Sequence, residues 1–392
     1  MTAFESRAPL RENTMNANAT SAPITLYGVP HSLYTARARS YFIKARLAYR
    51  EVAPNDPHYQ SEVIASAGCK LGLPTIECAD GTVIRDGAQI INHFEEASGH
   101  TFSPTGPKQR FFSRLFDAIG AEGLLRPAMH YRWNFDAENL DFLTFHFEML
   151  MPPGPKGAEM ARGAADRMRG AMRAFGVNDA TIPMVEAVYA EQLAAFNAHF
   201  AEHPYLLGGR PSIGDFGLIA PLFGHLGRDP KPLSIMLAEA TRVHRWVERM
   251  GRHAAAAPEF AHMDNAYLPD DTIPPTLIDL LKAMAIDFVP ETLAAAETIN
   301  AWIASQDDLP SGAPCERMVG FCNFEVRGTE VSAIAQPYRF YLLKRAQDER
   351  EAMDAATLAD IDKMLEEADA SELMDAQLTR AIGFKDNLEI WL

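Results

Sequence analysis

The stretch ITLYGVPHSLYTARARSYFIKARLAYREV, residues 24–52, decides how the chain begins to fold. It opens with a short β-rich run, 24–27, which a glycine and a proline end at positions 28 and 30. Apolar residues then recur at helical spacing from about 32 to 45, and a second β-rich run covers 48–52. Strand, helix and strand in this order predict a βαβ unit, whose two strands should lie parallel.

A hairpin and a further helix are expected directly after this unit. Residues 74–78 and 83–84 are β-rich, and they flank the turn Ala79-Asp80-Gly81-Thr82. Asp-Gly is favoured in two-residue hairpin turns, because both turn positions take positive φ there. A helix should then begin at Asp86, with Ile90, Ile91 and Phe94 on one face. The predicted order of elements up to residue 100 is therefore β-α-β-β-β-α.

The rest of the chain is mainly helical by its pattern. A linker at 100–108 holds two prolines and a glycine, and a second linker at 268–275 is rich in proline and aspartate. Between the linkers, helices are predicted over about 109–124, 135–150, 157–174, 181–202, 215–226 and 236–250. After the second linker, residues 276–392 should be mainly helical, with one hairpin formed by 321–326 and 331–334.

Composition excludes several classes of protein. The 392 residues carry a formal net charge of −16, which counts against nucleic acid or an anionic membrane surface as the main partner. The four cysteines form no CxxC pair, so a disulfide framework, a redox dithiol and a zinc site are not expected. Residues 1–22 lack an apolar signal region and are interpreted as a disordered tail. No transmembrane span is expected, and a cytoplasmic protein is the default expectation.

Four motifs, in this order, resemble those of the cytosolic glutathione transferase family. Residues 26–35, LYGVPHSLYT, are similar to the family's strand-to-helix turn, and residues 71–74, LGLP, to its cis-proline loop. Residues 85–91, RDGAQII, resemble the acidic start of its third helix. Residues 206–216, LLGGRPSIGDF, resemble a capping segment of its helical domain. The resemblance covers about 24–265 and says nothing of 276–392.

The resemblance implies a fold class and a division into domains. It implies an α/β thioredoxin-like N-terminal domain at 23–100, which binds glutathione. An all-α domain of the glutathione-transferase type should follow at 109–266 and bind the second substrate. Residues 276–392 then form a mainly helical C-terminal extension, whose role the resemblance leaves open.

The resemblance also implies an activity. A glutathione transferase activates the thiolate of glutathione, its cosubstrate, for attack on a small hydrophobic or aromatic electrophile, often in detoxification. A cytoplasmic homodimer without a metal is implied as well. Two alternatives stay open. One is a non-catalytic binding or interaction protein on the same scaffold, and the other is a glutathione-dependent lyase, dehalogenase or isomerase with a narrow substrate range.

Three hydroxyl groups are candidates for activating the glutathione thiol. A thiol with a pKa of about 8.5 is only about 3% thiolate at pH 7, so a donor to the sulfur is needed. Ser32 takes the place of the family's sulfur-facing residue, at the start of a predicted helix whose dipole would assist. Ser32 would equally serve as a plain helix cap. Tyr27 and Tyr34 are the rival donors, with packing on the strand and helix as their alternative roles.

Four further residues are expected, from the resemblance, to bind glutathione. Pro74 would present the backbone of Leu73 to glutathione as a strand edge, if the bond between them is cis. Asp86 would bind the γ-glutamyl ammonium group, although with Gln89 it also fits a helix-capping box. The family usually places serine after this acid, and here Gly87 keeps the backbone N–H but lacks the hydroxyl.

Two segments are candidates for contact with the second substrate. His130, Tyr131, Arg132 and Trp133 are dense in aromatic and polar groups and could hold an aromatic substrate with an anionic group. The segment 336–341, QPYRFY, is aromatic and basic within an acidic chain. It could close over the active site, pack at a subunit interface, or simply start a helix docked on the preceding domain.

Overall fold

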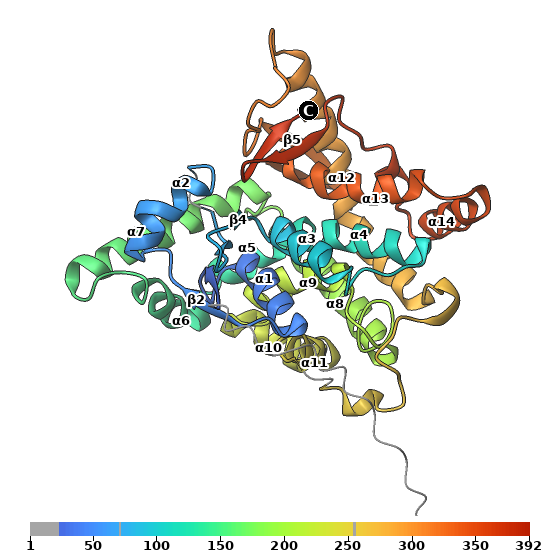
Figure 1. The fold of residues 1–392 in the computed structure, drawn as a ribbon, viewed down its shortest axis with the longest axis horizontal. Helices are drawn as coiled ribbons and strands as arrows, with labels where there is room; N and C mark the ends of the chain where they lie inside the picture. Colours follow the sequence, from blue (N-terminus) through green and yellow to red (C-terminus); the bar gives the residue numbers. More distant parts are fainter. Residues whose placement is uncertain (1–22, 70–71, 254–255) are drawn as a thin grey trace, which may run out of the picture.

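The computed structural model describes residues 23–69, 72–253 and 256–392, so the predicted disordered tail at 1–22 lies outside the described residues (Figure 1). The N-terminal part follows the expected order of elements. These are β1 (Ile24–Tyr27), α1 (Leu33–Ala45), β2 (Tyr49–Val52), the π-helix η1 (Tyr59–Val63), α2 (Ile64–Ser66), β3 (Thr75–Glu77), β4 (Val83–Arg85) and α3 (Gly87–Ser98).

The first four strands form one mixed sheet in the order β2-β1-β3-β4. β1 and β2 pair in parallel, with Leu26 opposite Glu51, as the βαβ pattern predicts. β3 runs antiparallel to both β1 and β4, with Ile76 between Leu26 and Ile84. The turn between β3 and β4 differs in detail from the prediction. Among its residues Gly81 has positive φ, at +84°, but Asp80 does not, so the connection is not the expected two-residue turn.

Side-chain caps fix where the two flanking helices begin. Ser32 precedes α1 in an extended conformation, and its Oγ accepts a hydrogen bond from the backbone N–H of Thr35. Asp86 precedes α3, and its Oδ1 accepts from the N–H groups of Ala88 and Gln89. Such caps satisfy N–H groups that have no partner within the helix. Both caps therefore set the helix ends that face the candidate site.

The middle part of the chain is helical, as predicted. Its helices are α4 (Pro107–Glu122), α5 (Leu125–Trp133), α6 (Asp136–Glu148), α7 (Pro155–Gly170), the 3₁₀ helix η2 (Ala171–Phe175), α8 (Ile182–Glu202), α9 (Ile213–Gly224), α10 (Pro230–Glu239) and α11 (Thr241–Met250). Short 3₁₀ turns follow at Pro258–Phe260 and Pro269–Asp271.

Three features of this part differ from the prediction. The segment that contains the candidate substrate residues forms a separate helix, α5, between the helices predicted at 109–124 and 135–150. The single helix expected at 236–250 is two helices, because the chain leaves helical conformation at Ala240 (φ −141°, ψ 54°). α10 also starts earlier than expected, with Pro230 in the first-turn position that proline favours.

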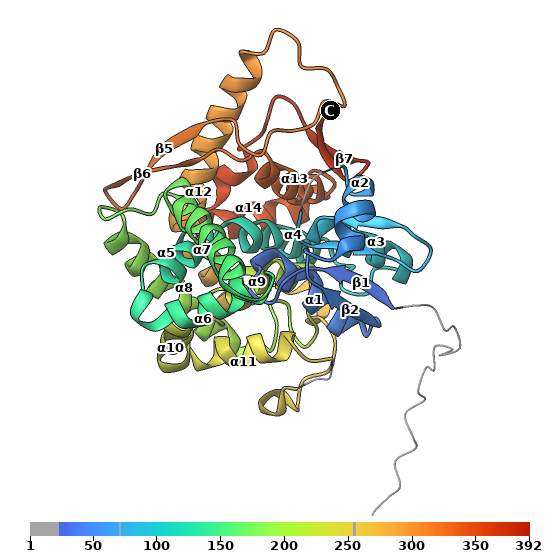
Figure 2. The same ribbon diagram turned by 90° about the vertical axis from the view of Figure 1, so that its left-hand side faces the viewer.

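The C-terminal extension contains helices and two hairpins. Its elements are α12 (Pro275–Ala304), β5 (Phe321–Val326), β6 (Thr329–Ile334), α13 (Tyr338–Glu351), α14 (Ala355–Glu367), the 3₁₀ helix η5 (Ser371–Met374), β7 (Ile382–Lys385) and β8 (Leu388–Trp391). The hairpin of β5 and β6 was predicted. The hairpin of β7 and β8 was not, although Asp386 and Asn387 both have positive φ at its turn. Figure 2 shows β7 beside α2, at the edge of the N-terminal sheet.

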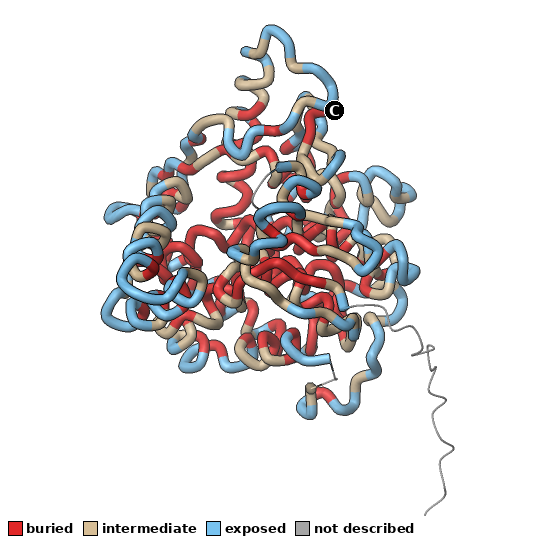
Figure 3. Tube along the Cα trace, turned by 60° about the vertical axis from the view of Figure 1, so that its left-hand side comes forward, coloured by how far each residue is buried: buried red, intermediate tan, exposed pale blue. Residues whose placement is uncertain are grey.

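One continuous apolar core joins all three parts of the chain. The largest cluster of buried residues includes Phe42 of α1, Phe216 of α9, Leu281 of α12, Leu343 of α13 and Trp391 of β8. Figure 3 shows this buried interior running through the molecule. α12 packs against α8, and α13 packs against α4. The extension is therefore built into the same core as the helices before it.

Within the described ranges, no helix is both long enough and apolar enough to cross a membrane.

Candidate active site

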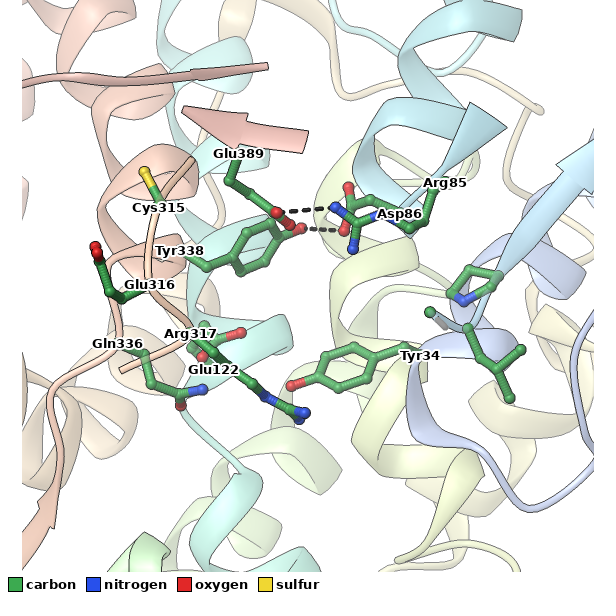
Figure 4. Close-up of a pocket in the computed structure, with 13 residues that line it drawn as sticks. Tyr34, Arg85, Asp86, Glu122, Cys315, Glu316, Arg317, Gln336, Tyr338 and Glu389 are labelled. Carbon is green, nitrogen blue, oxygen red and sulfur yellow. Dashed lines mark hydrogen bonds and ion pairs between the residues drawn. The ribbon is translucent and has the colours of Figure 1, made fainter. Parts of the chain in front are cut away.

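A cavity of about 460 Å³ lies where the N-terminal sheet, α4 and the extension meet (Figure 4). Its walls come from segments far apart in the sequence. The lining residues are Tyr34, Gly72, Leu73, Pro74, Arg85, Asp86, Glu122, Cys315, Glu316, Arg317, Gln336, Tyr338 and Glu389. Of the glutathione-binding residues expected from the sequence, Leu73, Pro74 and Asp86 therefore line one cavity together.

Leu73 and Pro74 lie just before β3, and the peptide bond between them is cis. The carbonyl oxygen of Pro74 accepts a hydrogen bond from the N–H of Asp86, at 3.1 Å. Within the described residues, no hydrogen bond engages the backbone N–H or C=O of Leu73. An extended peptide ligand would find these two groups available at the wall of the cavity, since unpaired backbone groups at a sheet edge can accept an added strand.

The carboxylate of Asp86 accepts three hydrogen bonds from within the protein. Its Oδ1 caps α3, and its Oδ2 accepts a 2.8 Å hydrogen bond from the phenol of Tyr338 in the extension. Burial raises the pKa of Asp86, while nearby Arg37 and the hydrogen bond from Tyr338 counteract the rise. Both carboxylate oxygens thus already have partners without any ligand.

The C-terminal hairpin closes the neighbouring side of the cavity. Arg85 donates to the carbonyl of Asn387, and it forms a 2.8 Å ion pair with Glu389. The side-chain amide of Asn387 accepts from the N–H of Arg85 and donates to the carbonyls of Val83 and Ser66. The hairpin is therefore held to β4 and to the end of α2 by a set of directed hydrogen bonds.

The three candidate hydroxyl groups occupy different positions. Tyr34 lines the cavity, and Figure 4 shows its phenol directed toward Arg317 and Glu122. Ser32 caps α1 and does not line this cavity. Tyr27 is 1% exposed, stacks on Tyr59 and donates to Glu77, so its hydroxyl is used away from the cavity.

Burial raises the pKa of Tyr34, and the negative charge of Glu122 adds to the rise. The phenol is therefore protonated at neutral pH and is available as a hydrogen-bond donor. Within the described residues, its hydroxyl has no hydrogen-bond partner. Tyr34 is thus the one of the three candidates whose hydroxyl faces the space that Leu73 and Asp86 also line.

Gly87 lies beside the cavity wall and packs against Arg37. A Cβ at this position would lie 3.1 Å from Cδ of Arg37, which is a tight contact. The Arg37 guanidinium pairs with the buried carboxylate of Asp117 in α4. A serine here would therefore crowd a buried arginine, and this gives a physical reason for the glycine.

The four candidate substrate residues on α5 do not line this cavity. Arg132 forms a buried ion pair with Asp229 and donates to the carbonyls of His31 and Gly224. The ring of His130 hydrogen-bonds to Glu186. Tyr131 and Trp133 are 5% and 3% exposed. His130 and Arg132 thus have polar partners, and Tyr131 and Trp133 pack against Tyr189 of α8 and Phe147 of α6. Within the described residues, the buried Nε1 of Trp133 has no hydrogen-bond partner.

Glu122 and Arg317 line the cavity and were not singled out from the sequence, whereas Gln336 belongs to the segment 336–341, for which closing over the active site was one of three alternatives. A signal existed for Glu122, which is the one acid in the otherwise apolar run Ala118 to Leu125. Arg317 and Gln336 belong to the extension, so only the folded chain brings them to the N-terminal part. Tyr338 lies in the segment 336–341, and it both starts α13 and reaches the cavity.

Comparison with known proteins agrees with this topology. Residues 179–249, which span α8 to α11, match the family model described as glutathione S-transferase, C-terminal domain. No curated protein sequence matches the chain.

Several solved structures are similar. A glutathione transferase, GSTFuA3, from Phanerochaete chrysosporium shares 17% identity at a TM-score of 0.42, over 59% of this chain and 97% of that one. The beta-etherase LigF from Sphingobium sp. strain SYK-6 shares 15% identity at a TM-score of 0.41, over 61% and 99%. A glutathione S-transferase from Xanthobacter autotrophicus shares 19% identity at a TM-score of 0.33, over 65% and 98%.

A thioredoxin-like α/β unit followed by an all-helical region defines the class of the protein as one with the glutathione transferase fold. The family match shows that α8 to α11 are similar to the C-terminal domain of glutathione S-transferases, and the residues after α11 lie outside that match.

Proposed function

We propose that this chain binds glutathione in the cavity at Leu73, Asp86 and Tyr34 and activates its thiol for attack on a small electrophile. The observation that carries the proposal is the juxtaposition of an unpaired backbone segment at Leu73 with an unpaired phenol at Tyr34. The free backbone groups of Leu73 can pair with a peptide ligand, and the phenol of Tyr34 can donate a hydrogen bond that stabilises a thiolate. The match of residues 179–249 to the glutathione S-transferase C-terminal domain supports glutathione as the peptide.

In this proposal Tyr34 donates its hydrogen bond to the sulfur. The phenol lies in the first turn of α1, so the positive end of the helix dipole favours the thiolate as well. Lowering the thiol pKa by about two units corresponds to about 2.7 kcal/mol, and it would convert most of the bound thiol to thiolate at pH 7. Ser32, at the N-cap of the same helix, is the second candidate donor.

The reaction is proposed as the addition or exchange of glutathione at an electrophilic carbon. A narrow substrate range, as in a lyase, dehalogenase or isomerase, is favoured by one observation. Residues of the extension, Arg317, Gln336 and Tyr338, line the cavity and restrict the space left for an electrophile. A non-catalytic binding protein remains the alternative if the thiol is bound but not ionised.

The test is a titration of the purified full chain with glutathione, in which melting temperature and thiolate absorbance are followed together. A ligand that binds only the folded state raises stability by RT ln(1 + [L]/Kd), so millimolar glutathione should raise the melting temperature. Tyr34→Phe should remove the thiolate signal, whereas Ser32→Ala should retain it. The reverse pattern would move the role to Ser32. No shift in the wild-type chain would exclude the glutathione site.

A further inference from the structure

Among the described residues, four carboxylic acids line the cavity, and Glu122 is the one left buried without a partner. The Asp86 carboxylate accepts three hydrogen bonds, and Glu389 forms an ion pair. Glu316 is exposed and accepts a hydrogen bond from the indole of Trp391. Within the described ranges, no hydrogen bond or ion pair engages the Glu122 carboxylate, and its Oε2 is buried. Buried polar groups are normally paired, so this unpaired carboxylate points to a functional role.

The surroundings of Glu122 favour its protonated form. The residue ends α4 and is 3% exposed, and a carboxylate at a helix C-terminus is opposed by the negative end of the helix dipole. Burial raises the pKa of Glu122 to about 7, and the charges of Glu291 and Asp86 add to the rise, while those of Arg339 and Arg37 oppose it. A carboxyl group with a pKa close to neutral pH both accepts and returns protons readily, as general acid–base catalysis requires.

Tyr34 and Glu122 face the same space. Both line the cavity, and Figure 4 shows the Tyr34 phenol directed toward Glu122. Burial, followed by the negative charge of Glu122, raises the pKa of Tyr34. The phenol keeps its proton at neutral pH, so it can donate a hydrogen bond to a sulfur but cannot accept the proton that a thiol loses. That proton has to pass to another group of the cavity or to water.

A thiolate in this cavity would change the ionisation of Glu122. An ionised carboxylate and a thiolate in one buried space repel each other, so the two groups titrate as a coupled pair. Transfer of the thiol proton to Glu122 leaves a single negative charge on the sulfur. There the Tyr34 phenol and the positive end of the α1 dipole stabilise it. The carboxylate of Glu122 is therefore the acceptor that the charges in the cavity favour.

We propose that Glu122 is the catalytic base that accepts the thiol proton of glutathione. The S–H bond breaks, its electron pair stays on the sulfur, and the proton forms an O–H bond on the Glu122 carboxylate. When the sulfur attacks, the C–S bond forms and an electron pair moves to the leaving group or to a neighbouring atom of the electrophile. That atom takes the proton from Glu122, and the carboxylate is restored. The inference rests on the proposed function, to which it adds a second catalytic residue beside Tyr34.

The test counts the protons released when glutathione binds at pH 8, by calorimetry of the full chain in phosphate and in Tris buffer. S-methylglutathione, which has no thiol proton, gives the protons exchanged by binding alone. Relative to it, glutathione should release almost no proton from the wild type, because Glu122 retains it. Glu122→Gln should release about 0.7 proton, since a thiol with a pKa of 8.5 is still about three-quarters protonated at pH 8. Glu325→Gln, at an exposed position, is the matched control and should behave as the wild type does.

Infrared difference spectra of the wild type make the test independent of how well a variant folds. Glutathione should produce the band of a protonated carboxyl group, and S-methylglutathione should not. Absence of this band, or equal proton release from the wild type and Glu122→Gln, would overturn the inference. A thiolate signal that still depends on Tyr34 would then leave the proposed function intact. No binding of glutathione to the wild type would overturn both.

Discussion

The phenol of Tyr338 donates a 2.8 Å hydrogen bond to Oδ2 of Asp86, across 252 positions of sequence. Two further hydrogen bonds join α3 and α13. Gln89 donates to the hydroxyl of Tyr341 at 2.6 Å, and Arg345 donates to the side chain of Asn92. These hydrogen bonds hold the extension against the N-terminal unit at the wall of the cavity. Substitutions in the extension should therefore alter the position of Asp86 and the shape of the cavity.

The first prediction concerns this hydrogen bond. Tyr338→Phe removes a donor from a buried carboxyl group and should lower the free energy of unfolding by roughly 1–3 kcal/mol. Tyr34→Phe is the matched control, because no hydrogen bond to its hydroxyl is present within the described residues, and it should change stability little. Urea unfolding of the three proteins measures the difference. Equal losses in both variants would contradict the assigned role of Tyr338.

Local patterns allowed much of the N-terminal fold to be predicted. The helix starts at Ser32 and Asp86 depend on side chains that bond to the backbone two or three residues away. The parallel pairing of β1 and β2 follows from a βαβ connection within 29 residues, 24–52. Such features are set by neighbours in the sequence, so a single sequence is enough to indicate them.

The part of the cavity wall that the C-terminal extension contributes could not be predicted from local patterns. Arg317, Tyr338 and Glu389 meet Arg85 and Asp86 only because α12 and α13 share a core with α8 and α4. No local pattern states which distant surface an amphipathic helix will cover. The last hairpin was missed for a different reason. Its strands have four residues each, and the turn signal Asp386-Asn387 is brief.

The second prediction uses the ionisation of Glu122. Burial and the negative charges of Glu291 and Asp86 raise its pKa from 4.5 to about 7, while Arg339 and Arg37 oppose the rise. Because the folded state holds this proton more tightly than the unfolded state, the group stabilises the fold at low pH. That stability is full below pH 4.5 and is lost as the pH rises through about 7. The shift corresponds to roughly 3 kcal/mol.

Glu122→Gln should therefore remove this pH dependence. Measured by urea unfolding, its free energy of unfolding relative to the wild type should increase from pH 5 to pH 8 and then level off. The arginines near Glu122 stay charged over this range, so they do not add a slope of their own. A constant difference between the two proteins across this range would show that Glu122 is already ionised at pH 5.

The third prediction tests how the C-terminal hairpin is held. Asn387 combines a left-handed backbone, with φ of +63°, and side-chain hydrogen bonds to the backbone of Ser66, Val83 and Arg85. Asn387→Gly keeps the turn and removes the amide, so it should cost roughly 1–3 kcal/mol. Asn387→Ala adds the strain of a left-handed alanine, about 1 kcal/mol more.

Hydrogen exchange of the β4 amides gives the second readout for these variants. The N–H of Arg85 donates to the Asn387 side chain, so its exchange should accelerate in both variants. Exchange in β1, away from the hairpin, should stay as in the wild type. If Asn387→Gly is as stable as the wild type and exchanges equally slowly at Arg85, the hairpin is held by Glu389 and its packing instead.

The fourth prediction concerns the close approach of α4 and α9. A Cβ on Gly120 would overlap the backbone of Gly217 and Leu218, and one on Gly217 would lie 2.7 Å from Cα of Asp117. The two helices can separate only by disturbing the core that also carries Glu122. Gly120→Ala should therefore cost about 3 kcal/mol or more, at the upper end of what overpacking causes.

Gly163→Ala in α7 is the matched control. The nearest atom to its added Cβ is Nη1 of Arg167 at 3.7 Å, which is ordinary contact, and the residue lies within a helix. Alanine there should raise the free energy of unfolding by about 0.5–1 kcal/mol, because glycine is the poorer helix former. The melting temperature and the urea midpoint should therefore fall for Gly120→Ala and rise for Gly163→Ala. A tolerated Gly120→Ala would mean that α4 and α9 do not pack backbone against backbone.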